Sequence, residues 1–289
     1  MKTFLHPLQN LAEMEAIYTK AKSNRGILEI SGCMESQKAH LIYGLSGLFT
    51  SHLILAEDEK AAKELYEDYR FYDKNVYYYP AKDLLFFQAD IHGNLLIRQR
   101  MRVIKALLEQ KENITVVTSI DGCMDYLQPL DKIEKQLIHF RNDSTLDMDK
   151  LKDALVHMGY ERVGQVEMPG QFSVRGGIVD IYSLTEENPW RIELWGDEID
   201  SIRTFDSQSQ RSLENLDEIT IYPATEQPAE KGGVSFLDYF AEKNSLVFLD
   251  EPNRLEENSR AVEEEFRQSC ENRQQKGEGN LSQSWMCSW

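Results

Sequence analysis

The sequence predicts an α/β fold combined with a separate α+β domain, and three observations carry this prediction. Short apolar runs alternate with amphipathic stretches over residues 1–125. β-Branched and aromatic segments, separated by turn residues, then occupy most of residues 126–222. From residue 223 onward the pattern changes again, to helical segments around one short strand. Strands alternating with helices form parallel sheets, whereas closely spaced strands with turns between them form antiparallel ones.

The first region is predicted to contain four strands and four helices. Apolar periodicity indicates the helices, and β-branched or aromatic runs indicate the strands. The predicted strands cover 27–31, 52–55, 76–79 and 114–118, and the predicted helices cover 8–22, 36–48, 57–71 and about 93–110.

The middle and last regions are predicted in the same way. A helix over 147–158 opens on two aspartates, which favour a helix N-terminus, and it ends near Gly159. A strand is expected over 133–140, and further strands in the segments QFSVR, GIVDIYS, WRIELWG and EIDSIRTFD. After residue 223 the pattern predicts a helix over 234–242, a strand over 246–249, a long charged helix over 253–273 and a frayed end from Gly277.

Charge and composition narrow the function classes. The net charge of −17 over 289 residues disfavours strong binding to a phosphate backbone. The four cysteines form no CxxC pair and no metal-ligand spacing with histidine, so reduced thiols and no metal are expected. The N-terminus lacks the apolar stretch of a signal peptide, and no run is long enough to span a membrane. A cytoplasmic location is therefore expected.

The segment 27–48 lies where a nucleotide-binding α/β protein places its phosphate loop. The required pattern is GxxxxGK[ST]. Gly32 and Lys38 fit it, but Gln37 replaces the second glycine and Ala39 replaces the hydroxyl that binds Mg²⁺. Three interpretations stay open: a relic that has lost its nucleotide, an unrelated strand-to-helix turn, and a working ATP site.

Three further groups of residues allow alternative functions. LVFLDE, which ends in Asp250 and Glu251, is similar to a Walker B strand, although a core strand with a solvated acidic end is the simpler interpretation. The cluster around His92 with Arg98, Arg100 and Arg102 could contact DNA, but a solvated helix face is the simpler interpretation. The aromatic residues 77–79, 86 and 87 could stack on bases, but a buried strand and packed loop explain them more simply.

Several ordered blocks of sequence carry a family resemblance. FSVRGGIVDIY is followed by RIELWGDEIDSIR and FDSQSQR, and YPAKDLLFFQADIHGNLLIRQRMR lies upstream over 79–102. Together they resemble the UvrB-like N-terminal region of the bacterial transcription-repair coupling factor family. The resemblance covers roughly residues 20–275.

The resemblance implies both a domain layout and a function. It implies a helicase-like lobe with a degenerate phosphate loop at 1–125, an inserted α+β domain that binds UvrA at 126–222, and a return to the first lobe at 223–289 that is incomplete or truncated. The family's UvrA contacts map onto Arg175, Arg191 and Trp195, the last being Trp where some relatives have Phe. Arginine and tryptophan are frequent interface anchors.

The function that follows is a non-catalytic module without cofactor or metal, which recruits UvrA in transcription-coupled nucleotide excision repair. RNA polymerase and double-stranded DNA would be bound through family domains outside these 289 residues. An ATP-hydrolysing repair protein of the UvrB type and a DNA-binding module are the alternatives. From residue type alone, Arg175 and Arg191 could instead form ion pairs within the domain, with Glu193 or Asp180, and Trp195 could belong to the core.

Overall fold

A computed structural model describes residues 5–23, 26–82, 91–109, 113–226, 233–241 and 244–276. The chain forms two compact units. The first comprises the described residues of 1–87, 109–127 and 229–289, and the second those of 88–108 and 128–228. The second unit is therefore largely an insertion in the sequence of the first.

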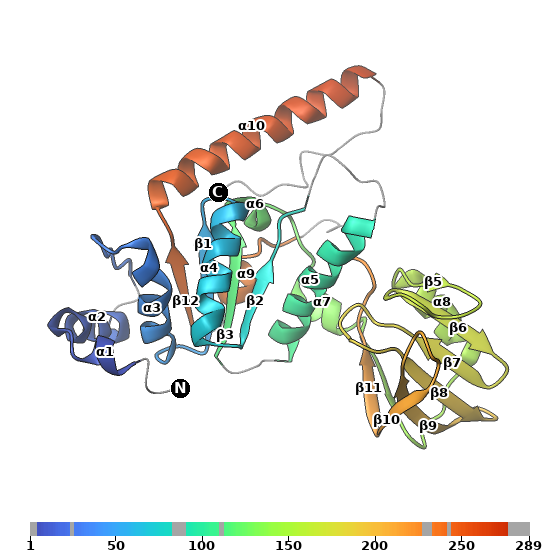
Figure 1. Cartoon of the computed structure of the whole chain (residues 1–289). Helices are drawn as coiled ribbons and strands as arrows, with labels where there is room; N and C mark the ends of the chain where they lie inside the picture. Colours follow the sequence, from blue (N-terminus) through green and yellow to red (C-terminus); the bar gives the residue numbers. More distant parts are fainter. Residues whose placement is uncertain are drawn as a thin grey trace. The chain divides into compact units, whose positions relative to one another are not determined.

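The first unit is built on a parallel four-stranded sheet in the order β12-β1-β3-β2 (Figure 1). Every residue of β1 and β3 is buried. Burial on both faces is typical of central strands in parallel sheets, and it explains their nearly continuous apolar sequences. The strands are β1 (Ser51–Ala56), β2 (Val76–Tyr79), β3 (Ile114–Ser119) and β12 (Ser245–Leu249).

Helices α3 (Glu35–Ser46) and α4 (Glu59–Tyr72) cover one face of this sheet. Asp58 caps α4 by accepting a hydrogen bond from the amide of Ala61 at 2.7 Å. The buried residues of α4 recur at helical spacing and pack against the strands. The other helices of the first unit are α1 (His6–Gln9), α2 (Ala12–Ser23), α6 (Ile120–Cys123), α9 (Asp238–Ala241) and α10 (Pro252–Lys276).

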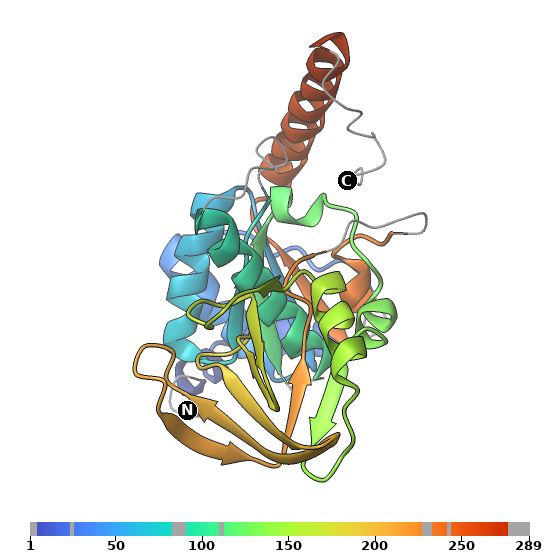
Figure 2. The same cartoon turned by 90° about the vertical axis from the view of Figure 1, so that its right-hand side faces the viewer.

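Helix α10 is one uninterrupted rod in both views (Figure 2). Its sequence is strongly charged, but Leu255, Phe266 and Cys270 are buried. These positions lie on one stripe, so α10 packs through a narrow apolar seam. The sequence predicted this helix to within a few residues at each end.

The strand predicted over residues 27–31 does not form. These residues pair with no strand, and the side chain of Ile27 is 97% exposed. Short apolar runs form strands only where a neighbouring strand supplies hydrogen bonds. The apolar pattern of residues 27–31 does not show whether a second strand lies beside this segment in a register that allows hydrogen bonding.

The second unit contains a six-stranded sheet in the order β10-β9-β8-β7-β6-β5, antiparallel except between β5 and β6. A separate two-stranded ribbon joins β4 and β11. The strands of this unit are β4 (Ile138–Arg141), β5 (Glu161–Arg162), β6 (Gln171–Arg175), β7 (Ile178–Ile181), β8 (Trp190–Trp195), β9 (Glu198–Phe205), β10 (Ser212–Leu216) and β11 (Glu218–Ile221).

Helices α5 (Ile91–Leu108), α7 (Leu130–Glu134) and α8 (Met148–His157) share one hydrophobic core with these sheets. Met101 and Ile104 of α5 lie in this core, so α5 belongs to the second unit. The sequence-based boundaries, 1–125, 126–222 and 223–289, placed this helix in the first domain. The difference arises because helical periodicity reveals an apolar face but not the surface that covers it.

The strand predicted over residues 133–140 is correct only in its second half. Residues up to Glu134 belong to α7, and β4 begins at Ile138. Pro129 directly precedes α7, and Ile133 is buried in the core of the second unit. A short apolar run next to a proline can start either a helix or a strand, and here packing favours the helix.

Candidate functional site

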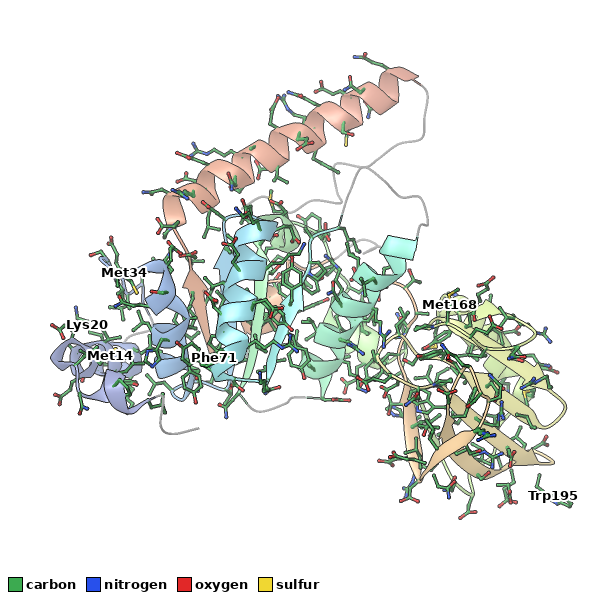
Figure 3. All side chains as sticks on the ribbon, in the orientation of Figure 1. Met14, Lys20, Met34, Phe71, Met168 and Trp195 are labelled. Carbon is green, nitrogen blue, oxygen red and sulfur yellow. The ribbon has the colours of Figure 1, made fainter. Side chains whose placement is uncertain are left out.

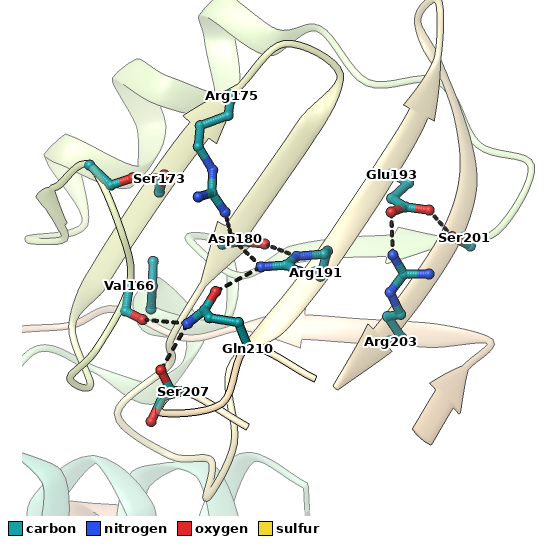
Figure 4. A network of polar contacts seen from close by, with 11 residues as sticks. Val166, Ser173, Arg175, Asp180, Arg191, Glu193, Ser201, Arg203, Ser207 and Gln210 are labelled. Atoms are coloured by element: carbon teal, nitrogen blue, oxygen red, sulfur yellow. Dashed lines mark hydrogen bonds and ion pairs between the residues drawn. The ribbon is translucent and has the colours of Figure 1, made fainter. Parts of the chain in front are cut away.

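The face of the six-stranded sheet opposite its core carries a concentrated set of charged side chains. Alternate residues of a strand point to opposite faces. Phe172, Val179 and Ile192 face the core, so their neighbours in the strands face outward. The outward charged residues include Arg175, Asp180, Arg191, Glu193 and Arg203, which form ion pairs among themselves (Figure 4).

Asp180 lies at the centre of this face and joins two arginines. Its side chain is only 1% exposed. Arg191 donates from Nε to Oδ1 at 2.7 Å and from Nη2 to Oδ2 at 2.8 Å. Arg175 donates from Nη2 to the same Oδ2 at 2.7 Å. The carboxylate is thus satisfied by charge-assisted bonds, as a buried acid requires.

Arg191 is held on three sides. It donates from Nη2 to Oε1 of Gln210 at 3.0 Å, and its guanidinium lies 4.3 Å from the centre of the Phe205 ring. Its hydrogen bonds to Asp180 raise the pKa of the guanidinium above its ordinary value. Its side chain is 14% exposed, against 47% for Arg175. Arg175 is therefore the more accessible of the two cations.

Trp195 ends β8 and is 84% exposed (Figure 3). It pairs with Glu198 across a tight turn, in which Gly196 has a φ of 65° that favours glycine. An indole this exposed is unusual, because tryptophan is highly buried on average. Its position at the tip of a hairpin makes it available to a partner.

The structure shows which ion pairs the two arginines form within the domain and how exposed Trp195 is. Arg175 and Arg191 do form ion pairs within the domain, and the shared partner is Asp180. Glu193 instead pairs with Arg203, a residue that no sequence motif singled out. Alternation within EIDSIRTF could have placed Arg203 on the same face. The assignment of Trp195 to the core is wrong.

The suspected phosphate loop leads to a second polar cluster. Gly32 has a φ of 79°, and α3 begins at Glu35. Gln37 accepts a hydrogen bond from the amide of Met34 at 3.3 Å, so its side chain caps the helix. Ala39 is buried in the core of the first unit. These two departures from the phosphate-loop pattern thus have structural roles in α3.

Lys38 reaches across to the acidic end of β12. Its Nζ lies 2.7 Å from Asp250, 2.7 Å from Glu35 and 3.3 Å from Glu251. Burial acts to lower the pKa of Lys38, but the hydrogen bonds that Lys38 donates to these carboxylates outweigh burial and raise the pKa. Burial, together with the neighbouring carboxylates of Glu35 and Glu251, raises the pKa of the Asp250 carboxyl, although Lys38 acts to lower it. Lys38 is therefore engaged by Glu35 of its own helix and by the two acids that follow β12.

The basic cluster on α5 is not a solvated face. Arg100 is fully buried and pairs with Glu226, with its Nε 2.5 Å from the carboxylate. Arg98 donates to the backbone carbonyl of Glu186 at 2.8 Å. The side chain of His92 and residues 86 and 87 lie outside the described residues. Tyr78 and Tyr79 are buried in β2, which leaves their rings unavailable to bases.

Other kinds of site can be assessed only over the described part of the chain. There, no group of three or more histidine, cysteine, aspartate or glutamate side chains is arranged to hold a metal ion. Cys33, Cys123 and Cys270 form no disulfide within the described residues, and Cys287 lies outside those residues. Among the described helices, none combines the length and apolarity needed to cross a membrane.

Comparison with known proteins identifies the second unit. Residues 138–226 match the family model of the UvrB interaction domain. The chain is 38% identical to the transcription-repair-coupling factor of Bacillus subtilis strain 168 over 222 residues, which is 70% of this chain and 19% of that protein. It is 29% identical over 269 residues to the factor of Staphylococcus haemolyticus, covering 73% of this chain and 23% of that protein. The chain thus spans about a fifth of the length of these relatives.

Proposed function

Because this chain contains a UvrB interaction domain and is related to the UvrB-like N-terminal region of transcription-repair coupling factors, we propose that it binds UvrA without performing catalysis. The observation that supports this most directly is the outer face of the UvrB interaction domain. It presents a half-exposed arginine, a second arginine paired beneath it and an exposed tryptophan.

The proposed binding site consists of Arg175, Arg191 and Trp195. Trp195 supplies a flat apolar surface, which buries a large area with little loss of side-chain freedom. Arg175 supplies a planar fork suited to a carboxylate of the partner. The partner surface should therefore be acidic, with an apolar recess for the indole. Binding would recruit UvrA during transcription-coupled nucleotide excision repair, as the name of the relatives suggests.

In this proposal, contacts with RNA polymerase and duplex DNA belong to other parts of the longer relatives, since this chain spans only about a fifth of them. The chain itself would act in the cytoplasm as a docking module. Its first unit would contribute a helicase-like lobe whose nucleotide site is degenerate. The engagement of Lys38 by three carboxylates supports this, because phosphate oxygens would have to compete with them.

The decisive experiment is calorimetry of this chain with purified UvrA. Arg175→Ala, Arg191→Ala and Trp195→Ala should each weaken binding by at least about tenfold. Arg141→Ala and Val156→Ala are matched controls, because their side chains are 78% and 59% exposed on other elements of the same unit. The controls should bind within about twofold of wild type. A folded wild-type chain that does not bind UvrA would refute the proposal.

The ATPase alternative is tested by titrating the chain with a fluorescent ATP analogue and Mg²⁺. No saturable binding is expected at millimolar nucleotide. Saturable nucleotide binding that is lost in Lys38→Met would instead favour a working ATP site.

A further inference from the structure

The central carboxylate of the outer face has no role in the proposed binding set, but its geometry connects two members of that set. Asp180 accepts hydrogen bonds from both Arg175 and Arg191 while being 1% exposed. Its partners come from β6 and β8, the two strands that flank β7. The carboxylate thus joins the two guanidinium groups.

Arg175 depends on Asp180 for its position. Within the described residues, its guanidinium makes one hydrogen bond, from Nη2 to Asp180, and the side chain is 47% exposed. Its other N–H groups remain available to an acceptor on a partner. An arginine side chain that rotates freely loses rotamer entropy when it binds a partner. A side chain whose guanidinium group is already hydrogen-bonded loses less.

Arg191 serves mainly to hold Asp180 in place. Its Nε and Nη2 form a two-pronged contact with the carboxylate, and Gln210 and the Phe205 ring hold the guanidinium from other sides. Gln210 is itself fixed, because its Nε2 donates to the carbonyl of Ser207 at 2.8 Å (Figure 4). With 14% of its side chain exposed, Arg191 has little surface to offer a partner.

We propose that Asp180 is a positioning residue for UvrA binding, that it presents Arg175 to an acidic group of UvrA, and that Arg191 acts chiefly through Asp180. This inference rests on the proposed function. It assigns the direct contact to Arg175 and a supporting role to Arg191. If the two arginines had the same role, their side chains would be similarly exposed. Instead, Arg175 is much more exposed than Arg191.

A double-mutant cycle with UvrA tests this assignment. Asp180→Asn keeps the size of the side chain and removes its charge, and it should weaken binding by about tenfold. In the Arg175→Ala background the same change should alter Kd by less than about twofold, because the group that Asp180 positions is gone. An equal loss in both backgrounds, or no loss in wild type, would overturn the proposal.

Glu193→Gln is the matched control. It removes the charge of a second ion-paired carboxylate on the same face, which pairs with Arg203 and not with Arg175. Its Kd for UvrA should stay within about twofold of wild type. A loss as large as that of Asp180→Asn would show that the face responds to any lost charge, which would also overturn the proposal.

A measurement without UvrA separates this inference from the proposed function. Rotation of the Arg175 guanidinium, followed by NMR of its side-chain nitrogens, should be slower than that of the exposed Arg211. It should become as fast as Arg211 in Asp180→Asn. Equal rates in the wild-type chain would refute the positioning role even if Asp180→Asn failed to fold. A wild-type chain with slow Arg175 rotation and no affinity for UvrA would refute only the proposed function.

Discussion

Lys38 illustrates how the contacts of a single side chain bear on the proposed loss of nucleotide binding. It occupies the lysine position of a phosphate-loop pattern, but three carboxylates surround its ammonium group. Its side chain is 12% exposed and that of Asp250 is 15% exposed, so the pair is poorly screened by solvent. The contact links α3 to the end of β12 and contributes to the stability of the first unit.

Lys38→Met should therefore destabilise the chain. Removing the lysine leaves Glu35, Asp250 and Glu251 close together without a counter-charge, and the expected loss is about 1–3 kcal/mol. Urea unfolding followed by circular dichroism measures it. Lys60→Met is the control, since Lys60 is 84% exposed and pairs only loosely with Glu64 at 3.9 Å. Equal effects of the two substitutions would contradict the structural role of Lys38.

Asp121 makes stability depend on pH. Burial, and then the nearby carboxylates of Glu59 and Asp58, raise the pKa of Asp121 to about 6. The folded chain therefore binds this proton more tightly than the unfolded chain, whose value is 3.8. The resulting stabilisation is present at low pH and is lost as pH rises from about 4 to about 6.

Asp121→Asn should remove the loss of stability that the ionisation of Asp121 causes as pH rises. Relative to wild type, the variant should gain stability across that pH window and keep a gain of about 1 kcal/mol at pH 7–8, after allowance for solvent screening. Unfolding free energies of both chains at pH 4 and pH 7.5 provide the test. If the difference in unfolding free energy between the variant and wild type were the same at both pH values, Asp121 would titrate normally.

At the scale of single elements, α4 shows a helix that is defined locally. Its cap, its apolar face and its exposed charges can all be recognised in the sequence of residues 58–72. The observed limits of α4 are close to the predicted 57–71. The predicted strand over 27–31 shows the opposite case, because a strand needs a neighbour that the segment itself does not contain. Helices were accordingly easier to predict than strands.

Asp58→Ala should cost about 1 kcal/mol, because the side chain accepts the amide hydrogen of Ala61 at the start of α4. Asp68→Ala on the exposed side of the same helix is the control, and it should change stability by less than about 0.5 kcal/mol. Thermal unfolding of the two variants side by side measures the difference. A larger loss for Asp68→Ala would mean that the cap does not limit the stability of α4.

At the scale of the whole molecule, charge governs the choice of partner. The net charge of −17 opposes a DNA backbone, and the arginines at 98 and 100 are engaged within the second unit. Duplex DNA should therefore not be bound at physiological salt, and gel-shift titrations over a salt series would show this. Tight binding that weakens steeply with salt would reveal a basic surface outside the described residues.

The proposed UvrA site is only partly predictable from the sequence. Family resemblance and residue type together indicate Arg175, Arg191 and Trp195. The exposure of Trp195 and the unequal exposure of the two arginines were not predictable, because exposure depends on what packs nearby. Gln210 was missed because it enters the face from the loop between β9 and β10.

The sequence by itself determined the types of most helices and strands, the alternation that puts Arg175, Asp180 and Arg191 on one face, and the departures from a nucleotide-binding loop. Those properties follow from spacings of a few residues, which the local backbone geometry converts directly into structure. Only the tertiary structure decided that Asp180 joins two arginines, that Lys38 meets Asp250 and that α5 joins the second unit. Strand register and helix packing bring such groups together from distant parts of the chain. A pattern among neighbouring residues does not show which distant residues will meet.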